Sequence, residues 1–264
     1  MEHDHPHILA VAVGNTRTRF GIFHGRELAD SGVEPNDTPE AIVAGIARLA
    51  ESSHGAAVTM ASVNPPIAEK LAGLLADADL RVLRIGKDIP ITIRHTLDDD
   101  STIGQDRLLN ALGAYARAQQ ACVVIDVGTA VTVDFVDGEG IFHGGVIAPG
   151  VRMMLRALHE QTASLPSVEF VSPDPARGPF GKDTKHAMIL GVQSMVQGLA
   201  RLMIEQYAEH YEAYPQVVAT GGDAGPILSS DPTIEHIVPD LQLIGLAEAC
   251  LAALESEDDD GGED

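Results

Sequence analysis

The sequence predicts an α/β protein built from two related domains with a cleft between them. Hydrophobic residues make up 45% of the 264 residues, enough to fill one large core or two compact ones. Apolar, strand-like runs alternate with segments of helical spacing along the chain. An apolar strand, a glycine-containing turn and a β-branched strand occur at 8–23 and again at 123–136. Because this repeat is too long for a solenoid, we predict two similar domains.

The first domain is predicted to span residues 1–118. Its predicted strands lie at 8–13, 18–23, 57–63 and 81–85. One helix is expected to begin at Pro39, with Thr38 as its N-cap. A second helix is expected to begin at Asn64-Pro65. A third helix is predicted at 106–119, where Leu108, Leu109, Leu112 and Tyr115 follow at helical spacing.

The second domain is predicted to span residues 119–254. We expect strands at 121–127, 131–136, 140–148, 217–220 and 241–243, and helices at 151–160, 184–211 and 247–254. The last ten residues, 255–264, contain seven carboxylates and no base. Since this acidic tail has no apolar side chain to bury, we predict that it is disordered.

The charge and composition exclude several classes of protein. The formal net charge is −22, and so acidic a surface repels phosphate backbones, so we expect no nucleic-acid partner. No apolar run approaches the ~20 residues that span a bilayer, and the polar start lacks a secretory signal, so we expect a cytoplasmic protein without a membrane partner. Cys122 and Cys250 lie in apolar surroundings and are expected to be reduced core thiols.

The first glycine turn runs Val13-Gly14-Asn15-Thr16-Arg17. Glycine permits a tight backbone, and exposed amides with a threonine hydroxyl can hold phosphate oxygens. Arg17 and Arg19 can add positive charge. Alone, the pattern is also that of an ordinary hairpin.

The second glycine turn follows the most apolar predicted strand and runs Asp126-Val127-Gly128-Thr129. A carboxylate at the end of a buried strand is costly without a cation or hydrogen-bond donors nearby. Asp126 therefore indicates a neighbouring cation or a cation bound to phosphate. The alternative is a capped turn.

A third candidate segment, Gly104-Gln105-Asp106-Arg107, opens a predicted helix. The helix dipole favours a charged Asp106, and Arg107 can bind a carboxylate or phosphate with its planar fork. An ionised aspartate that reaches an alcohol is a plausible general base for phosphoryl transfer. The alternative is an ordinary helix start with a surface arginine.

Three further segments are rich in glycine: 144–150, 181–184 and 220–223. The first and third suggest backbone that lines a pocket, or simple punctuation between elements. In the second, Thr184 begins a long helix, and its simplest role is that of an N-cap.

Taken in order, the motifs GNT, GQDR, DVGTAVT, GGVIAPG, GKDT and TGG resemble the type III pantothenate kinase family over about residues 8–254. This resemblance implies two duplicated actin-like ATPase (ribonuclease H-like) domains of the acetate kinase/hexokinase/actin superfamily. It also implies ATP-dependent phosphorylation of pantothenate to 4'-phosphopantothenate, the first step toward coenzyme A, by a cytoplasmic homodimer that uses Mg²⁺ and K⁺ or NH₄⁺.

The resemblance also implies roles for individual residues. The first loop and the strand after it imply ATP contacts at Ala12, Val13, Gly14, Asn15, Thr16, Arg17, Thr18 and Arg19. Thr129 is a further implied ATP contact, and Asp126 is the implied site of the monovalent cation. Pantothenate is implied to contact Gly104, Gln105, Asp106 and Arg107, with Asp106 as the proton acceptor. Thr184 is implied to contact substrate from the partner subunit.

Two positions depart from the family pattern. The family's first loop opens with an aspartate that helps place magnesium and the phosphates, and Ala12 stands there in this chain. The family's usual tyrosine near the pantothenate pocket is replaced at about Leu97, before Asp98-Asp99-Asp100. The alternatives are therefore a non-catalytic or regulatory relative, or a sugar or acetate kinase of the same superfamily.

Overall fold

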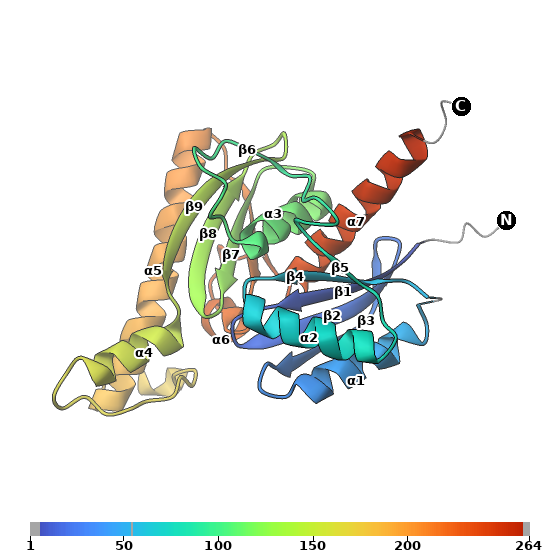
Figure 1. The fold of residues 1–264 in the computed structure, drawn as a ribbon. Helices are drawn as coiled ribbons and strands as arrows, with labels where there is room; N and C mark the ends of the chain where they lie inside the picture. Colours follow the sequence, from blue (N-terminus) through green and yellow to red (C-terminus); the bar gives the residue numbers. More distant parts are fainter. Residues whose placement is uncertain (1–5, 54, 261–264) are drawn as a thin grey trace. The chain divides into compact units, whose positions relative to one another are not determined.

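The structure is a computed structural model that describes residues 6–53 and 55–260, and it divides into two compact units (Figure 1). The first unit comprises the chain up to Gln119 together with the segment from Asp240 onward. The second unit comprises Gln120–Pro239.

The first unit contains a mixed five-stranded sheet in the order β3-β2-β1-β4-β5. Strands β1 to β3 pair antiparallel, whereas β4 and β5 continue the sheet parallel to β1. The elements are β1 (His7–Val13), β2 (Arg17–His24), β3 (Glu27–Pro35), α1 (Pro39–Ala50), β4 (Val58–Ser62), α2 (Pro65–Asp77), β5 (Val82–Arg84), β6 (Arg94–His95), α3 (Gln105–Ala118) and α7 (Leu241–Asp260).

The second unit repeats this arrangement with strands in the order β9-β8-β7-β10-β11. Strands β7 to β9 pair antiparallel, and β10 and β11 are parallel to β7. Its elements are β7 (Cys122–Val127), β8 (Ala130–Val136), β9 (Ile141–Pro149), α4 (Val151–Glu160), a 3₁₀ turn η1 (Pro175–Arg177), α5 (Thr184–Tyr211), β10 (Gln216–Thr220), α6 (Ala224–Leu228) and β11 (His236–Ile237). The predicted internal repeat is confirmed, because β1 to β5 correspond in order and direction to β7 to β11.

Each unit has its own hydrophobic core. In the first unit, Leu9 and Val11 pack with Ile42 and Ile46 of α1 and Leu71 of α2. The core of the second unit joins the inner strands to α4, α5 and α6. The predicted reduced thiols are confirmed: Cys122 and Cys250 are free and buried.

Helix α5 is the long apolar helix of the second unit. By length and composition alone it is apolar enough to cross a membrane, although 33% of its most apolar stretch is buried inside the protein. Val192, Val196 and Ile204 belong to the core of the second unit, which accounts for part of this hydrophobicity.

The C-terminal segment differs from the prediction in three ways. Residues 241–243 are the start of helix α7, not a strand, and the contacts of α7 place it in the first unit, not in a domain spanning 119–254. The reason is its close packing on α3, where Gly113 of α3 meets Gly245 of α7. Helix α7 also continues to Asp260, inside the tail predicted to be disordered, and residues 261–264 lie outside the described part.

Candidate functional site

The first glycine turn joins β1 to β2 in the first unit. The N–H of Gly14 donates to the carbonyl of Arg17 at 3.0 Å, and a Cβ on Gly14 would lie only 2.9 Å from that oxygen. A side chain at this position would therefore crowd the turn. The turn leaves Asn15, Thr16 and Arg17 exposed, and exposed amides and hydroxyls can hold phosphate oxygens.

Asn36, which sequence reasoning missed, holds this turn in place. Its side-chain amide donates to the carbonyl of Gly14 at 2.8 Å, and its backbone N–H donates to Thr16 at 3.0 Å. The buried hydroxyl of Thr18, a predicted ATP contact, donates to Asn36 Oδ1 at 2.8 Å. In the sequence, Asn36 lies between Pro35 and Asp37 and resembles an ordinary turn residue. No local signal therefore indicates a function for it.

Two predicted ATP contacts, Ala12 and Arg19, face each other across β1 and β2. Ala12 is only 2% exposed. The guanidinium of Arg19 forms an ion pair with Asp240 at 2.9 Å, just before α7. Arg19 is thus already neutralised by a carboxylate that sequence reasoning did not link to it.

The start of α3 is tied to the same edge of the sheet as this turn. Val63, just after β4, donates to the carbonyl of Val13 at 3.1 Å, which places the end of β4 beside the end of β1. The Gln105 side chain donates to Ile85 O at 3.0 Å and accepts from the Ser62 N–H at 3.4 Å. Through Gln105, the GQDR segment therefore lies at the carboxyl ends of β4 and β5, next to the strand that carries the GNT turn.

Asp106 lies in the first turn of α3 and is partly buried. Burial raises its pKa above that of an ordinary aspartate, and the Arg107 N–H, which donates to Asp106 Oδ1 at 2.9 Å, offsets only part of this effect. A Cβ on Gly104 would collide with the same carboxylate oxygen, so glycine makes room for Asp106. A partly buried carboxylate with a raised pKa suits a general base.

Leu97 and the three aspartates after it precede α3. Asp98, Asp99 and Asp100 are exposed, and Asp99 accepts a hydrogen bond from the Ser101 N–H at 2.9 Å. This acidic stretch is therefore a solvated loop with local turn bonds.

The second glycine turn joins β7 to β8 in the second unit. The N–H of Gly150, just before α4, donates to Thr129 O at 3.1 Å, and a Cβ on Gly150 would collide with the backbone of Gly128 and Thr129. The turn leaves Thr129 exposed. It occupies the place in this unit that the GNT turn occupies in the first.

Asp126 lies at the end of β7, beside the loop after β10. A Cβ on Gly221 would collide with Asp126 Oδ1, and Gly128 is also close to that oxygen. Asp223, the last residue of the glycine-rich segment 220–223, donates its N–H to Val127 O at 3.0 Å and pairs through its carboxylate with Arg152 of α4. Gly221 thus makes room for the Asp126 carboxylate itself, and oxygen ligands suit K⁺ or Mg²⁺ better than transition metals.

No group of three His, Cys, Asp or Glu side chains that could hold a metal ion occurs within residues 6–53 and 55–260. For magnesium, the family's first-loop ligand position is the buried methyl group of Ala12, which cannot coordinate a metal. The first loop therefore does not fit a magnesium ion held by the protein itself.

Thr184 is the exposed first residue of α5. Its predicted role as N-cap is wrong, because the N-cap is Asp183, whose carboxylate accepts from the His186 N–H at 2.8 Å. Arg177 holds Asp183 from the preceding loop at 2.8 Å. The hydroxyl of Thr184 is therefore not needed to cap the helix.

The strand order 3-2-1-4-5, used twice with a glycine turn after the first strand of each unit, is the arrangement of actin-like ATPases. Solved structures with this fold include component A of (R)-2-hydroxyglutaryl-CoA dehydratase from Acidaminococcus fermentans, at 16% identity and a TM-score of 0.55 over 95% of this chain and 98% of that one. Ethanolamine utilization protein EutJ from Carboxydothermus hydrogenoformans matches at 15% identity and a TM-score of 0.52 over 92% of this chain and 89% of that one.

Sequence comparison gives the particular family. The family model described as type III pantothenate kinase matches residues 8–206. A protein named type III pantothenate kinase from Frankia alni is 33% identical over 248 residues, which cover 90% of this chain and 96% of that protein. The chain belongs to the type III pantothenate kinase family, and this membership indicates a kinase that uses ATP.

Proposed function

We propose that this protein transfers the γ-phosphoryl group of ATP to the terminal hydroxyl of pantothenate, giving 4'-phosphopantothenate and ADP. The observation that carries the proposal is the partly buried Asp106 carboxylate at the start of α3, fixed through Gln105 beside the strand that carries the GNT turn. Family membership supplies the substrate class.

In this reaction Asp106 accepts the proton of the pantothenate hydroxyl, whose oxygen attacks the γ-phosphorus while the bond to the bridging oxygen of ADP breaks. The raised pKa of Asp106 makes it a stronger base than an exposed aspartate. Arg107 binds the pantothenate carboxylate. Amides and hydroxyls of the GNT turn and Thr129 hold the phosphate oxygens.

Two cations belong to the proposal in different ways. Magnesium enters as the Mg·ATP substrate complex, because Ala12 offers no ligand and no step depends on a protein-held magnesium. The carboxylate of Asp126, for which Gly221 makes room, would hold K⁺ or NH₄⁺, where a monovalent charge offsets the charge of the phosphates. If so, K⁺ raises the melting temperature of the wild type more than Na⁺ does, and Asp126→Asn abolishes the difference.

The exposed Thr184, which the helix does not need as a cap, supports a contact with substrate bound to the other subunit of a cytoplasmic homodimer. Mixing two inactive variants, Asp106→Asn and Thr184→Val, tests this arrangement. If sites are shared between subunits, the mixed dimers regain activity at one of their two sites. No recovery in mixtures shown to contain mixed dimers would contradict it.

The activity is tested by incubating the purified protein with Mg·ATP and K⁺ and a panel of pantothenate, glucose and acetate. Phosphopantothenate should form, whereas the other two acceptors should give no product. Formation of a sugar phosphate or acetyl phosphate instead would assign the chain to another kinase of this fold.

The second candidate is a relative that binds nucleotide without catalysis, and the buried methyl group of Ala12 favours it. The variant Ala12→Asp restores the family carboxylate opposite Arg19. An inert wild type that becomes a kinase through Ala12→Asp would support this candidate, whereas a wild type that is already active would remove it.

A further inference from the structure

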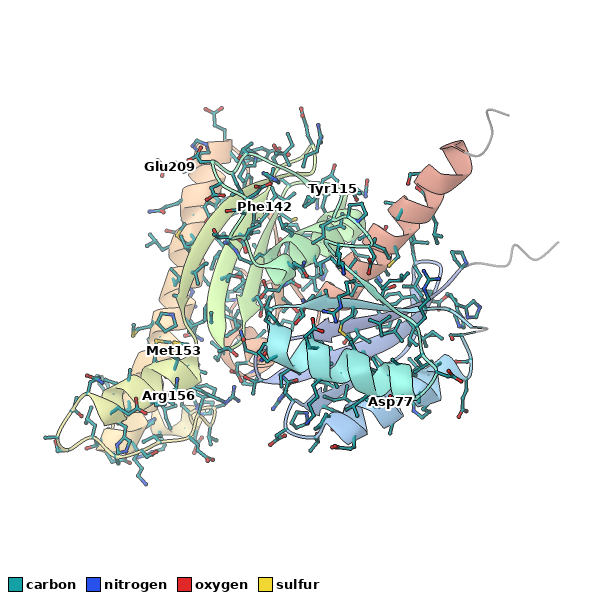
Figure 2. The ribbon with its side chains drawn as sticks, in the orientation of Figure 1. Asp77, Tyr115, Phe142, Met153, Arg156 and Glu209 are labelled. Atoms are coloured by element: carbon teal, nitrogen blue, oxygen red, sulfur yellow. The ribbon has the colours of Figure 1, made fainter. Side chains whose placement is uncertain are left out.

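A cavity of about 780 Å³ opens in the second unit between the C-terminal end of α5 and strands β8 and β9. It lies at the far end of the sheet from the Gly128–Thr129 turn, because β8 begins next to that turn and its last residue, Val136, pairs with Cys122 at the start of β7. Phe142 and Glu209, at this far end, and Met153 near the other end are labelled in Figure 2. The cavity is therefore separate from the candidate phosphate site of this unit.

A β-bulge shapes one wall of this cavity. Phe135 pairs with Gly144 and Val136 with Phe142, so His143 is an extra residue in β9. Gly144 has a φ of 85°, which favours glycine, and neither Gly144 nor Gly145 places a side chain in the space. The bulge turns the His143 ring toward Asp137, with Nε2 2.8 Å from Oδ2. The local backbone thus leaves a hollow and places a carboxylate at its edge.

Aromatic rings line the cavity in fixed positions. The buried Phe135 ring lies 5.2 Å from Tyr211, 5.6 Å from Tyr207 and 5.8 Å from His143, measured between ring centroids. The Tyr211 hydroxyl accepts from the Gly138 N–H at 3.0 Å, and the Tyr207 hydroxyl donates to Val133 O at 3.1 Å. Because both hydroxyls are anchored, a ligand meets rings that need no reorganisation.

Two acidic side chains lie beside these rings, and the two histidines that also line the cavity are His143, which pairs with Asp137, and His210. Asp137 and Glu212 both line the cavity, and the 28-residue helix α5 ends there at Tyr211, with the negative end of its dipole. Burial pushes the pKa of Asp137 up, but hydrogen bonds from His143, Ile141 and Glu139 outweigh it and hold the pKa below its usual value. Asp137 therefore stays ionised at neutral pH.

Aromatic rings, carboxylates and a helix C-terminus all favour a positive charge, and the apolar floor of Phe135, Val146 and Met203 favours a flat apolar body. We propose that this cavity binds a small organic cation in which an aromatic ring carries an alkylammonium group. This site goes beyond the proposed kinase activity and does not depend on it.

The test is isothermal titration calorimetry of the full chain with 2-phenylethylammonium as probe. The neutral isostere 2-phenylethanol, the anion phenylacetate and the ringless ethylammonium are compared with it. The cation is expected to bind at least about tenfold more tightly than 2-phenylethanol, corresponding to about 1.4 kcal/mol. Ethylammonium and phenylacetate should give no measurable binding.

Two pairs of variants locate the site. Glu212→Gln should weaken binding about two- to fivefold, whereas Glu209→Gln, which removes the same charge from the same end of α5 outside the cavity lining, should leave it unchanged. Tyr211→Ala should weaken binding about tenfold, and Tyr211→Phe, which keeps the ring, should retain most of it. Thermal unfolding checks that each variant is folded.

Equal binding of the cation and the alcohol would overturn the proposal, as would no binding of either by the folded wild type. Equal effects of Glu212→Gln and Glu209→Gln would also overturn it, because they would show attraction to the acidic surface as a whole.

Discussion

The crossing of α3 and α7 provides the sharpest structural prediction. A Cβ added to Gly245 would lie 2.6 Å from the carbonyl carbon of Leu109, and the carbonyl oxygen of Leu109 would be nearer still. Carbon atoms in contact are normally about 3.5–4.0 Å apart, so Gly245→Ala must move the two helix backbones about 1 Å apart. The neighbours are backbone atoms, which cannot rotate away as a side chain could.

The cost follows from two opposing effects. Replacing glycine by alanine inside a helix favours folding by about 1 kcal/mol, whereas overpacking typically costs about 1–3 kcal/mol and occasionally more. Because the clash here is with backbone, we expect Gly245→Ala to lower the free energy of unfolding by about 2 kcal/mol or more. At about 2–4 °C per kcal/mol, the melting temperature should fall by about 4–8 °C or more.

The matched control is Gly73→Ala in α2 of the same unit, where a new Cβ meets nothing within 4 Å. This variant should raise the melting temperature slightly, because only the helix-propensity effect remains. Both variants are compared with the wild type by thermal unfolding followed by circular dichroism. A Gly245→Ala protein that is as stable as Gly73→Ala would refute the close crossing, and with it the assignment of α7 to the first unit.

Gln105, Asp106 and the two cysteines each give a further prediction. Gln105→Ala removes the hydrogen bonds to Ile85 and Ser62, so it should lower the free energy of unfolding by about 1–3 kcal/mol. It should also lower kcat for pantothenate more than it changes the KM for ATP. An unchanged kcat would count against a positioning role for Gln105. Asp106→Asn should lose most of its activity yet melt at a higher temperature at neutral pH. Because the pKa of Asp106 is raised in the folded protein, ionisation of Asp106 destabilises the wild type above that pKa. The stability advantage of the variant should therefore vanish as the pH falls below about 3.9, the pKa of aspartate in the unfolded chain. A variant less stable than the wild type at neutral pH would contradict the raised pKa. Burial raises the pKa of Cys122 to about 12 and the pKa of Cys250 to about 11. Neither thiol should therefore react with a thiol reagent at pH 8 until the protein unfolds. Rapid labelling of the folded chain would show that the thiols are accessible and contradict this prediction.

The repeated unit was predictable because its signals are local. A buried strand, a glycine turn and a β-branched strand are written directly into the sequence at 8–23 and 123–136, and the structure confirms both. Helices α4 and α5 also begin and end where their apolar spacing predicts. Strand β3 was missed, because Glu27–Pro35 is a largely exposed strand with few apolar residues.

The misassigned elements depend on contacts far apart in the sequence. The start of α7 contains the segment Leu241-Gln242-Leu243-Ile244, whose alternating apolar residues resemble a strand until its packing on α3 is known. Pairing of Arg19 with Asp240 joins residues 221 positions apart, so no local pattern could reveal it. Anchoring of the GNT turn by Asn36 is equally a product of the folded sheet.

The sequence predicts the individual candidate residues, but not the contacts that hold them in place. Residue type and position predict Asp106, Asp126 and the two glycine turns as candidates, and their roles stay predictions. Their supports, such as the space that Gly104 leaves for Asp106 and the hydrogen bonds of Gln105, became visible only in three dimensions. The predicted substrate contact at Gln105 thus gains a second role, because its amide is used to fix the start of α3.

The most direct test of the account is the rate of phosphopantothenate formation by the wild type and by Asp106→Asn, measured by mass spectrometry with saturating Mg·ATP, pantothenate and K⁺. The account predicts product from the wild type and a rate lower by about 10²–10⁴-fold in the variant, with ATP affinity unchanged. If the variant formed phosphopantothenate at the wild-type rate, Asp106 would not be the base.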